Sequence, residues 1–185
     1  MMSRGNRLTQ LHTLLEAYSP VSNKEQEYLL RMKQLLDSPA DPFSRSHFRP
    51  GHFTSSSFIL SPNQKSLLLI LHSKLHRWLQ PGGHIEPTDS TCIESAKREM
   101  KEEVGIIVDT SNEVENPLFD IDIHTIPARN LVPEHLHFDL RFVFTAPDLQ
   151  FSVGSDALQA KWVLLHEITA TRSDHSVVRA VKKLL

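Results

Sequence analysis

Three glutamates are concentrated in the segment "REMKEEVG" (98–105), at Glu99, Glu102 and Glu103. On an α-helix these positions are neighbours, because three or four residues separate them. Two unit charges about 5.5 Å apart repel by about 3 kcal/mol at an effective dielectric of about 20. A divalent cation would convert this repulsion into attraction, and Mg²⁺ prefers oxygen ligands. The cluster is therefore interpreted either as a metal site or as a solvated helix face.

The basic residues among the glutamates do not form an obvious pattern of ion pairs. Lys97 and Lys101 are four residues apart, as are Glu99 and Glu103, so these neighbours carry like charges. This spacing does not indicate a surface built from salt bridges, and the residues upstream of the helix decide between the two interpretations.

The glutamates must be positioned by a helix that begins near Thr91 and ends near Val104. Thr91 and Glu94 fit a capping box, and Gly105 fits the position that follows a helix. The apolar residues at helical spacing predict a buried stripe of Ile93, Ala96, Met100 and Val104. The loop "PGGHIEPTDS" (81–90) precedes the helix, and its two glycines allow a close approach to an ion or ligand.

This loop and helix together resemble the Nudix box, usually written G-x5-E-x7-R-E-U-x-E-E-x-G-U with U apolar. The matching positions are Gly83, Asp89, Arg98, Glu99, Met100, Glu102, Glu103, Gly105 and Ile106. The sequence departs from the pattern in having Asp89 where the motif has Glu, and in placing eight residues between Asp89 and Arg98. The segments "GHFTSS", "RWLQPGGHIEP", "IHTIPA" and "HLHFDLRF" also look like a bacterial Nudix group with a helical N-terminal extension.

The resemblance implies hydrolysis of a nucleoside diphosphate linked to another group, by in-line attack of water on a pyrophosphate. It implies Mg²⁺ or Mn²⁺ as the cofactor, held by Glu99, Glu102, Glu103 and the Gly82 carbonyl. Arg98 would orient the glutamates, and Glu99 or Glu102 would activate the water. Many members add a Glu from a later loop, whereas the region 151–162 contains none and offers Asp156 as the nearest acid.

The predicted fold class is α/β, and the resemblance implies an α/β/α sandwich with a mixed central sheet. We expect a helical extension over residues 1–42 and a Nudix domain over 43–185. Ser22 with Glu25 fits a capping box in the extension, and Ser173 is the expected cap of a last helix. That last helix is expected to turn Val177, Val178, Val181 and Leu185 inward. Strands are predicted at 54–60, 65–73, 77–80, 119–126, 135–146 and 157–165, the first two forming a hairpin.

Histidines are the other residues that could take part in catalysis or binding, and the chain contains 11 of them. His135, His137 and Asp139 alternate on a predicted strand and so share one face, opposite the core residues Leu136, Phe138, Leu140 and Phe142. We expect this polar face to contact substrate, together with His84 and Glu86 of the loop. His52, His84 and His124 border segments that lead to the box. Structural roles, phosphate or base contacts, and a separate transition-metal site all remain open for the histidines.

Composition narrows the class of protein further. The formal net charge of −2 gives no reason to expect nucleic acid or membrane as a partner, so a small nucleotide-type substrate is expected. The single cysteine, Cys92, excludes an intramolecular disulfide, and we expect it to be buried in a cytoplasmic protein. The extension is interpreted as a cover for the cleft, a homodimer interface or a partner site. The alternative to an enzyme is a Nudix fold that binds a nucleotide without cleaving it.

Overall fold

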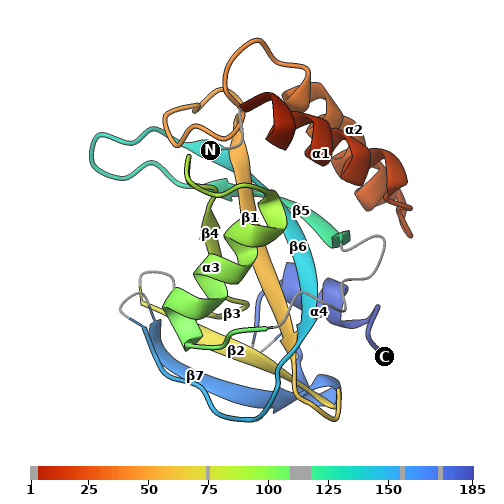
Figure 1. Cartoon of the computed structure of the whole chain (residues 1–185), viewed down its shortest axis with the longest axis vertical. Coiled ribbons are helices and arrows are strands. Elements are labelled where there is room, and N and C mark those ends of the chain that lie inside the picture. The colour runs from red at the N-terminus through yellow and green to blue at the C-terminus, as the bar shows by residue number, and fades with distance from the viewer. Residues whose placement is uncertain (1–3, 74–75, 109–117, 155–156, 171–172) are drawn as a thin grey trace. The chain divides into compact units, whose positions relative to one another are not determined.

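The computed structural model describes residues 4–73, 76–108, 118–154, 157–170 and 173–185 (Figure 1). The chain folds into two compact units. The first unit comprises Met1–Ser55, Gly83–Ser95 and Val114–Arg141, and the second comprises Ser56–Gly82, Ala96–Glu113 and Phe142–Leu185. Strands β1 (Gly51–Leu60) and β6 (His135–Thr145) and helix α3 (Cys92–Val104) each contribute residues to both units.

The first unit begins with two helices that lie side by side, α1 (Arg4–Ala17) and α2 (Asn23–Leu36) (Figure 1). The capping role of Ser22 is confirmed, because its hydroxyl accepts a hydrogen bond from the Glu25 N–H at 3.2 Å. The buried Glu25 carboxylate accepts from the Tyr18 hydroxyl at 2.7 Å and from the Val21 N–H at 3.2 Å. Helix α2 packs against strand β5 (Leu118–Ile126) of the same unit, so the helices preceding the sheet are part of a folded body.

The strands form a sheet of seven members in which hydrogen-bonded neighbours follow the order β3-β2-β1-β6-β5. Strand β4 (Gly82–His84) pairs with β1, and β7 (Ala157–Leu164) pairs with β2 (Ser66–His72). The predicted hairpin is confirmed, since β1 and β2 are antiparallel with Leu60 opposite Leu67. Strand β3 is limited to Trp78–Leu79 and is antiparallel to β2. The predicted α/β class, with helices before the sheet, is confirmed.

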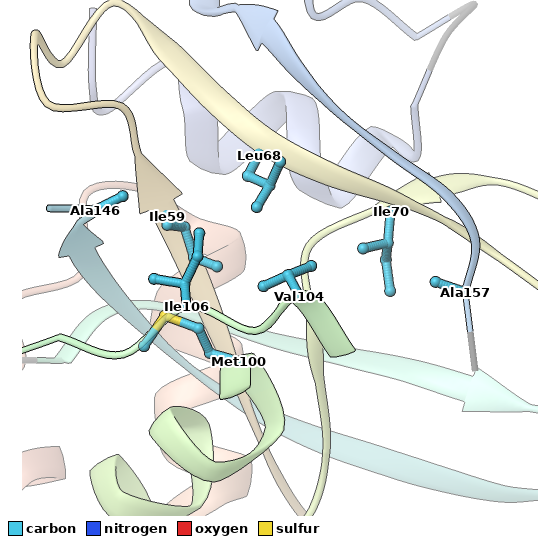
Figure 2. Close-up of a cluster of buried hydrophobic side chains, with 8 residues drawn as sticks. All are labelled: Ile59, Leu68, Ile70, Met100, Val104, Ile106, Ala146 and Ala157. Atoms are coloured by element: carbon cyan, nitrogen blue, oxygen red, sulfur yellow. The ribbon is translucent and has the colours of Figure 1, made fainter. Parts of the chain in front are cut away.

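The second unit has a hydrophobic core beneath the C-terminal half of α3 (Figure 2). Met100 and Val104 of the predicted stripe are fully buried, and they pack with side chains of β1 and β2. The complete cluster is Ile59, Leu68, Ile70, Met100, Val104, Ile106, Ala146 and Ala157. Burying a side chain of this size contributes about 1.5–3 kcal/mol. This burial determines which flank of α3 carries the glutamates.

The last helix, α4 (His175–Val181), differs from the prediction at its start and its end. Its N-cap is Asp174, whose carboxylate accepts from the Ser176 N–H at 2.9 Å. The predicted cap, Ser173, instead donates its hydroxyl to the Trp78 carbonyl at 2.5 Å. Leu185, predicted to face inward, is exposed because the helix ends before it. A short 3-10 turn, Leu165–Glu167, precedes this region.

The longest helices in the described part of the chain, α1 and α2, each have 14 residues. Within the described residues, no helix combines the length and the apolar character that a bilayer crossing requires.

Candidate active site

Helix α3 begins and ends as its sequence predicts. The Thr91 hydroxyl accepts a hydrogen bond from the Glu94 N–H at 3.1 Å, which caps the first turn. Gly105 follows the helix with φ of 70° and donates its N–H to the Lys101 carbonyl at 3.0 Å. That left-handed conformation favours glycine. Both ends of the helix that carries the glutamates are therefore held by local interactions.

Arg98 lies between two of the glutamates. Its Nη1 donates to Glu99 Oε1 at 2.9 Å and to Glu102 Oε2 at 3.0 Å. Arg98 and Glu102 thus form an ion pair across one helical turn, in keeping with the expectation that Arg98 bonds to the glutamates. The arginine offsets part of the repulsion among the glutamates and restricts the rotamers of both carboxylates.

Glu103 connects the helix to the glycine loop in the second unit. It is 7% exposed, and its Oε2 accepts a hydrogen bond from the Gly82 N–H at 2.8 Å. The preceding residue, Pro81, accepts through its carbonyl from the Ser57 N–H at 2.8 Å. The Ser57 hydroxyl in turn donates to the Ala96 carbonyl of α3 at 2.9 Å. Loop, strand and helix thus hold the predicted ligands Glu103 and Gly82 together.

Ser57 belongs to a run of buried serines, none of which is part of the Nudix box. The Ser55 hydroxyl donates to the Cys92 carbonyl at 2.7 Å in the first unit, and Ser56 accepts from Gln80 Nε2 at 3.3 Å in the second. The run "SSS" within a strand was the available signal, because consecutive hydroxyls in a buried strand require hydrogen-bond partners.

The segment after β6 covers the end of α3. The Gly154 N–H donates to the Glu103 carbonyl at 2.8 Å, and the Ser152 N–H donates to the Val104 carbonyl at 2.9 Å. A Cβ on Gly154 would lie 2.3 Å from the Glu102 carbonyl oxygen, so only glycine allows this approach. Asp156, the predicted substitute for a later-loop glutamate, lies outside the described residues.

In the first unit, Asp89 and Glu86 stabilise the loop before α3. Asp89 is buried, and its Oδ2 accepts from the Glu86 N–H at 2.8 Å, so the acid that departs from the motif closes a turn. The Glu86 carbonyl accepts from Arg7 Nη1 at 2.8 Å, and the Glu86 side chain forms an ion pair with Arg45. Glu86, a predicted substrate contact, already has a cationic partner.

The predicted substrate residues of β6 divide into two environments. Asp139 is buried, accepting from Thr54 Oγ1 at 3.1 Å and from Arg141 Nε at 2.9 Å. Arg141 also pairs with Asp120 at 3.1 Å and with Asp122 at 3.3 Å. Strand β6 is therefore buried on both faces here. The side chains of its polar face form a charged network and are not exposed to solvent. Sequence reasoning did not identify this network.

His135 and His137 instead lie among other histidines of the first unit. Their ring centroids are 5.3 Å apart, and His137 lies 5.2 Å from His84. His52 joins them, at 5.1 Å from His135 and 4.8 Å from His137. Burial lowers the pKa of His52 to about 4 and that of His137 to about 2, the latter also through neighbouring histidines. The rings of His52 and His137 are therefore neutral near pH 7.

Comparison with known protein families agrees with the box. A family model described as the NUDIX domain matches residues 52–183. The chain belongs to the Nudix family. The matched range includes Gly82 and the α3 residues Arg98, Glu99, Glu102 and Glu103.

Solved structures support the same Nudix assignment. A NUDIX-family hydrolase from Clostridium perfringens is 28% identical, with a TM-score of 0.53, over 72% of this chain and 95% of that one. A MutT NUDIX hydrolase from Burkholderia pseudomallei shares the fold at 17% identity and a TM-score of 0.53, over 72% of this chain and 97% of its own. No curated protein matches the chain.

Proposed function

We propose that this Nudix protein is a metal-dependent hydrolase that cleaves a phosphoanhydride bond in a nucleoside diphosphate linked to another group. The observation that carries the proposal is the arrangement on α3, where Arg98 orients Glu99 and Glu102 and where Glu103 is tied to Gly82. A helix devoted only to solvation would not need a buried carboxylate bonded to a glycine loop.

The donor set fits a hard divalent cation. Glu99, Glu102 and Glu103 present carboxylate oxygens on neighbouring positions of one helix, and the hydrogen bond from the Gly82 N–H holds Gly82 next to Glu103. We assign these four residues as ligands of Mg²⁺, with Mn²⁺ as a substitute. When bound, the metal would neutralise phosphate oxygens and lower the pKa of the attacking water.

The chain's own residues would then supply orientation and proton transfer. Arg98 keeps Glu99 and Glu102 in fixed rotamers, which reduces the entropy lost when they engage a ligand. One of these two glutamates would accept the proton of the water, as the Nudix resemblance implies. The Gly82 N–H fixes one Glu103 oxygen, so the charge of that carboxylate stays beside the loop.

A substrate panel tests the proposal. The full chain would be incubated with nucleoside di- and triphosphates, dinucleoside polyphosphates and ADP-ribose, each with Mg²⁺ or Mn²⁺, and phosphate-containing products would be separated by chromatography. Absence of turnover for all substrates with both metals would contradict the proposal. A nucleotide that raises the Tm but is recovered intact would instead support a binding module without catalysis.

Glu103→Gln isolates the contribution of the charge. Glutamine can still accept the hydrogen bond from the Gly82 N–H, so the loop remains anchored while one metal-binding charge is lost. We expect turnover to fall by at least about 10²-fold, the size of losing a strong electrostatic element. Glu94→Gln, an exposed first-turn glutamate on the same helix, is the matched control and should leave turnover unchanged.

A further inference from the structure

A cluster of three histidines in the first unit has the composition of a second kind of metal site. His52 comes from β1, and His135 and His137 come from β6. One ring nitrogen from each of them lies within 4.8 Å of the other two. The carboxylate site of the Nudix helix shares no residue with this group.

Hydrogen bonds determine which ring nitrogens are available. His52 Nδ1 lies 3.3 Å from the His47 carbonyl oxygen, and His135 Nδ1 lies 2.8 Å from the Pro133 carbonyl oxygen. A carbonyl only accepts, so both Nδ1 atoms carry the hydrogen and both Nε2 atoms keep a lone pair. Metal-ligating histidines usually have this arrangement, with the second ring nitrogen donating to a backbone carbonyl or carboxylate.

His52 Nε2 is buried and has no hydrogen-bond partner among the residues that the structure describes. His52 as a whole is 1% exposed. Leaving a buried polar atom unsatisfied opposes folding. A cation within the cluster would satisfy this lone pair, whereas packing alone does not.

The electrostatic surroundings favour a cation over an anion. A fourth histidine, His124, has its ring 5.5 Å from that of His137, and its Nδ1 lies 3.2 Å from Asp122 Oδ2. Asp122 belongs to the network in which three aspartates pair with the guanidinium of Arg141, so a carboxylate oxygen lies beside this edge of the histidine cluster.

We infer that His52, His135 and His137 bind one divalent transition-metal ion, of which Zn²⁺ is the representative. Imidazole nitrogens suit Zn²⁺, Ni²⁺ and Cu²⁺, whereas Mg²⁺ prefers the oxygens of the Nudix helix. At a Zn–N distance of 2.0–2.1 Å, tetrahedral ligand nitrogens are about 3.3 Å apart, so the present separations need to contract by about 1.5 Å at most. Side-chain rotation provides a movement of this size. The bound ion would crosslink β1 and β6 and keep a fourth position for another donor.

This inference is tested by measuring zinc binding to the full chain. Metal is first removed with a chelator, and binding is then measured by calorimetry and by competition with a chromogenic chelator. We expect one Zn²⁺ per chain, with affinity reduced at least about 10²-fold in His137→Gln and in His52→Gln. His12→Gln, an exposed histidine on α1, is the matched control and should bind as the unaltered chain does. Equal affinity in all four proteins would overturn the inference.

Glu103→Gln separates this site from the carboxylate site. Zinc bound by the histidines is unaffected by that substitution, whereas zinc bound by the Nudix glutamates is weakened by it, and the latter outcome would overturn the inference. The inference does not depend on hydrolysis, so a chain inactive on every substrate would still be expected to bind zinc through the histidines.

X-ray absorption spectroscopy on the unaltered chain tests the same site without requiring that any substituted chain folds. Three or more imidazole ligands around Zn²⁺ are expected from the scattering of the ring atoms. A shell of oxygens with one imidazole or none would contradict the assignment.

Discussion

Replacing Arg141 with methionine tests whether the charged network of the first unit is stabilised by the Arg141 guanidinium. Arg141 is 1% exposed, and its guanidinium pairs with Asp139 at 2.9 Å, Asp120 at 3.1 Å and Asp122 at 3.3 Å. These carboxyl groups raise the pKa of Arg141 above its ordinary value and keep it charged at every accessible pH. Methionine fills a similar volume but removes the guanidinium from three buried carboxyl groups.

The expected loss in the free energy of unfolding is about 3–5 kcal/mol, the range for breaking a buried ion pair from one side. For a chain of this length, about 2–4 °C of Tm is lost per kcal/mol, so the Tm should fall by roughly 6–20 °C. Urea unfolding followed by far-UV circular dichroism and by tryptophan fluorescence measures the loss, and agreement of the two probes checks for two-state behaviour.

Arg77→Met is the matched control for Arg141→Met. Arg77 pairs with Asp174 at 2.7 Å, a shorter distance, but its side chain is 63% exposed. An exposed pair contributes about 0–1 kcal/mol. Adding Asp122→Asn to Arg141→Met should recover part of the lost stability, because the second change removes one buried carboxylate that has lost its arginine. A loss within about 1 kcal/mol for Arg141→Met, or no recovery in the double variant, would refute the reasoning.

Two further predictions concern Cys92 and Gly154. Burial raises the pKa of the Cys92 thiol to about 12, so the folded chain keeps the thiol protonated while the unfolded chain ionises it at lower pH. The free energy of unfolding should therefore decline as pH rises above the ordinary thiol pKa. At pH 8 a disulfide reagent should modify the native chain at least ~10³-fold more slowly than the urea-unfolded chain. Equal rates would show that the thiol is accessible in the native chain. Gly154→Ala should destabilise the chain by about 1–3 kcal/mol and reduce turnover, because the added Cβ meets backbone atoms of Glu102 and Glu103. Gln150→Ala, an exposed residue of the same segment, should change stability by at most about 0.5 kcal/mol in the same urea titration, and a similar cost in both variants would contradict the steric explanation.

The helix that carries the Nudix glutamates was predictable from sequence because its determinants are local. The cap at Thr91, the stripe that includes Met100 and the stop at Gly105 lie within or next to the helix itself, and all are confirmed. The alternation of strands and turns likewise indicated the β1–β2 hairpin. The last helix was assigned the wrong cap because Ser173 and Asp174 are both good caps, and the contact of Ser173 with the Trp78 carbonyl decides between them.

The partners of polar side chains were decided by tertiary structure. Sequence alone placed His135 and His137 on one face of a strand, but only folding brings His52 beside them from another strand. Alternation predicted a polar face on β6, whereas the aspartates of β5 bury that face around Arg141. Periodicity specifies which side chains share a face. What covers that face depends on elements distant in the chain, and this determines whether a histidine is a surface group or a ligand.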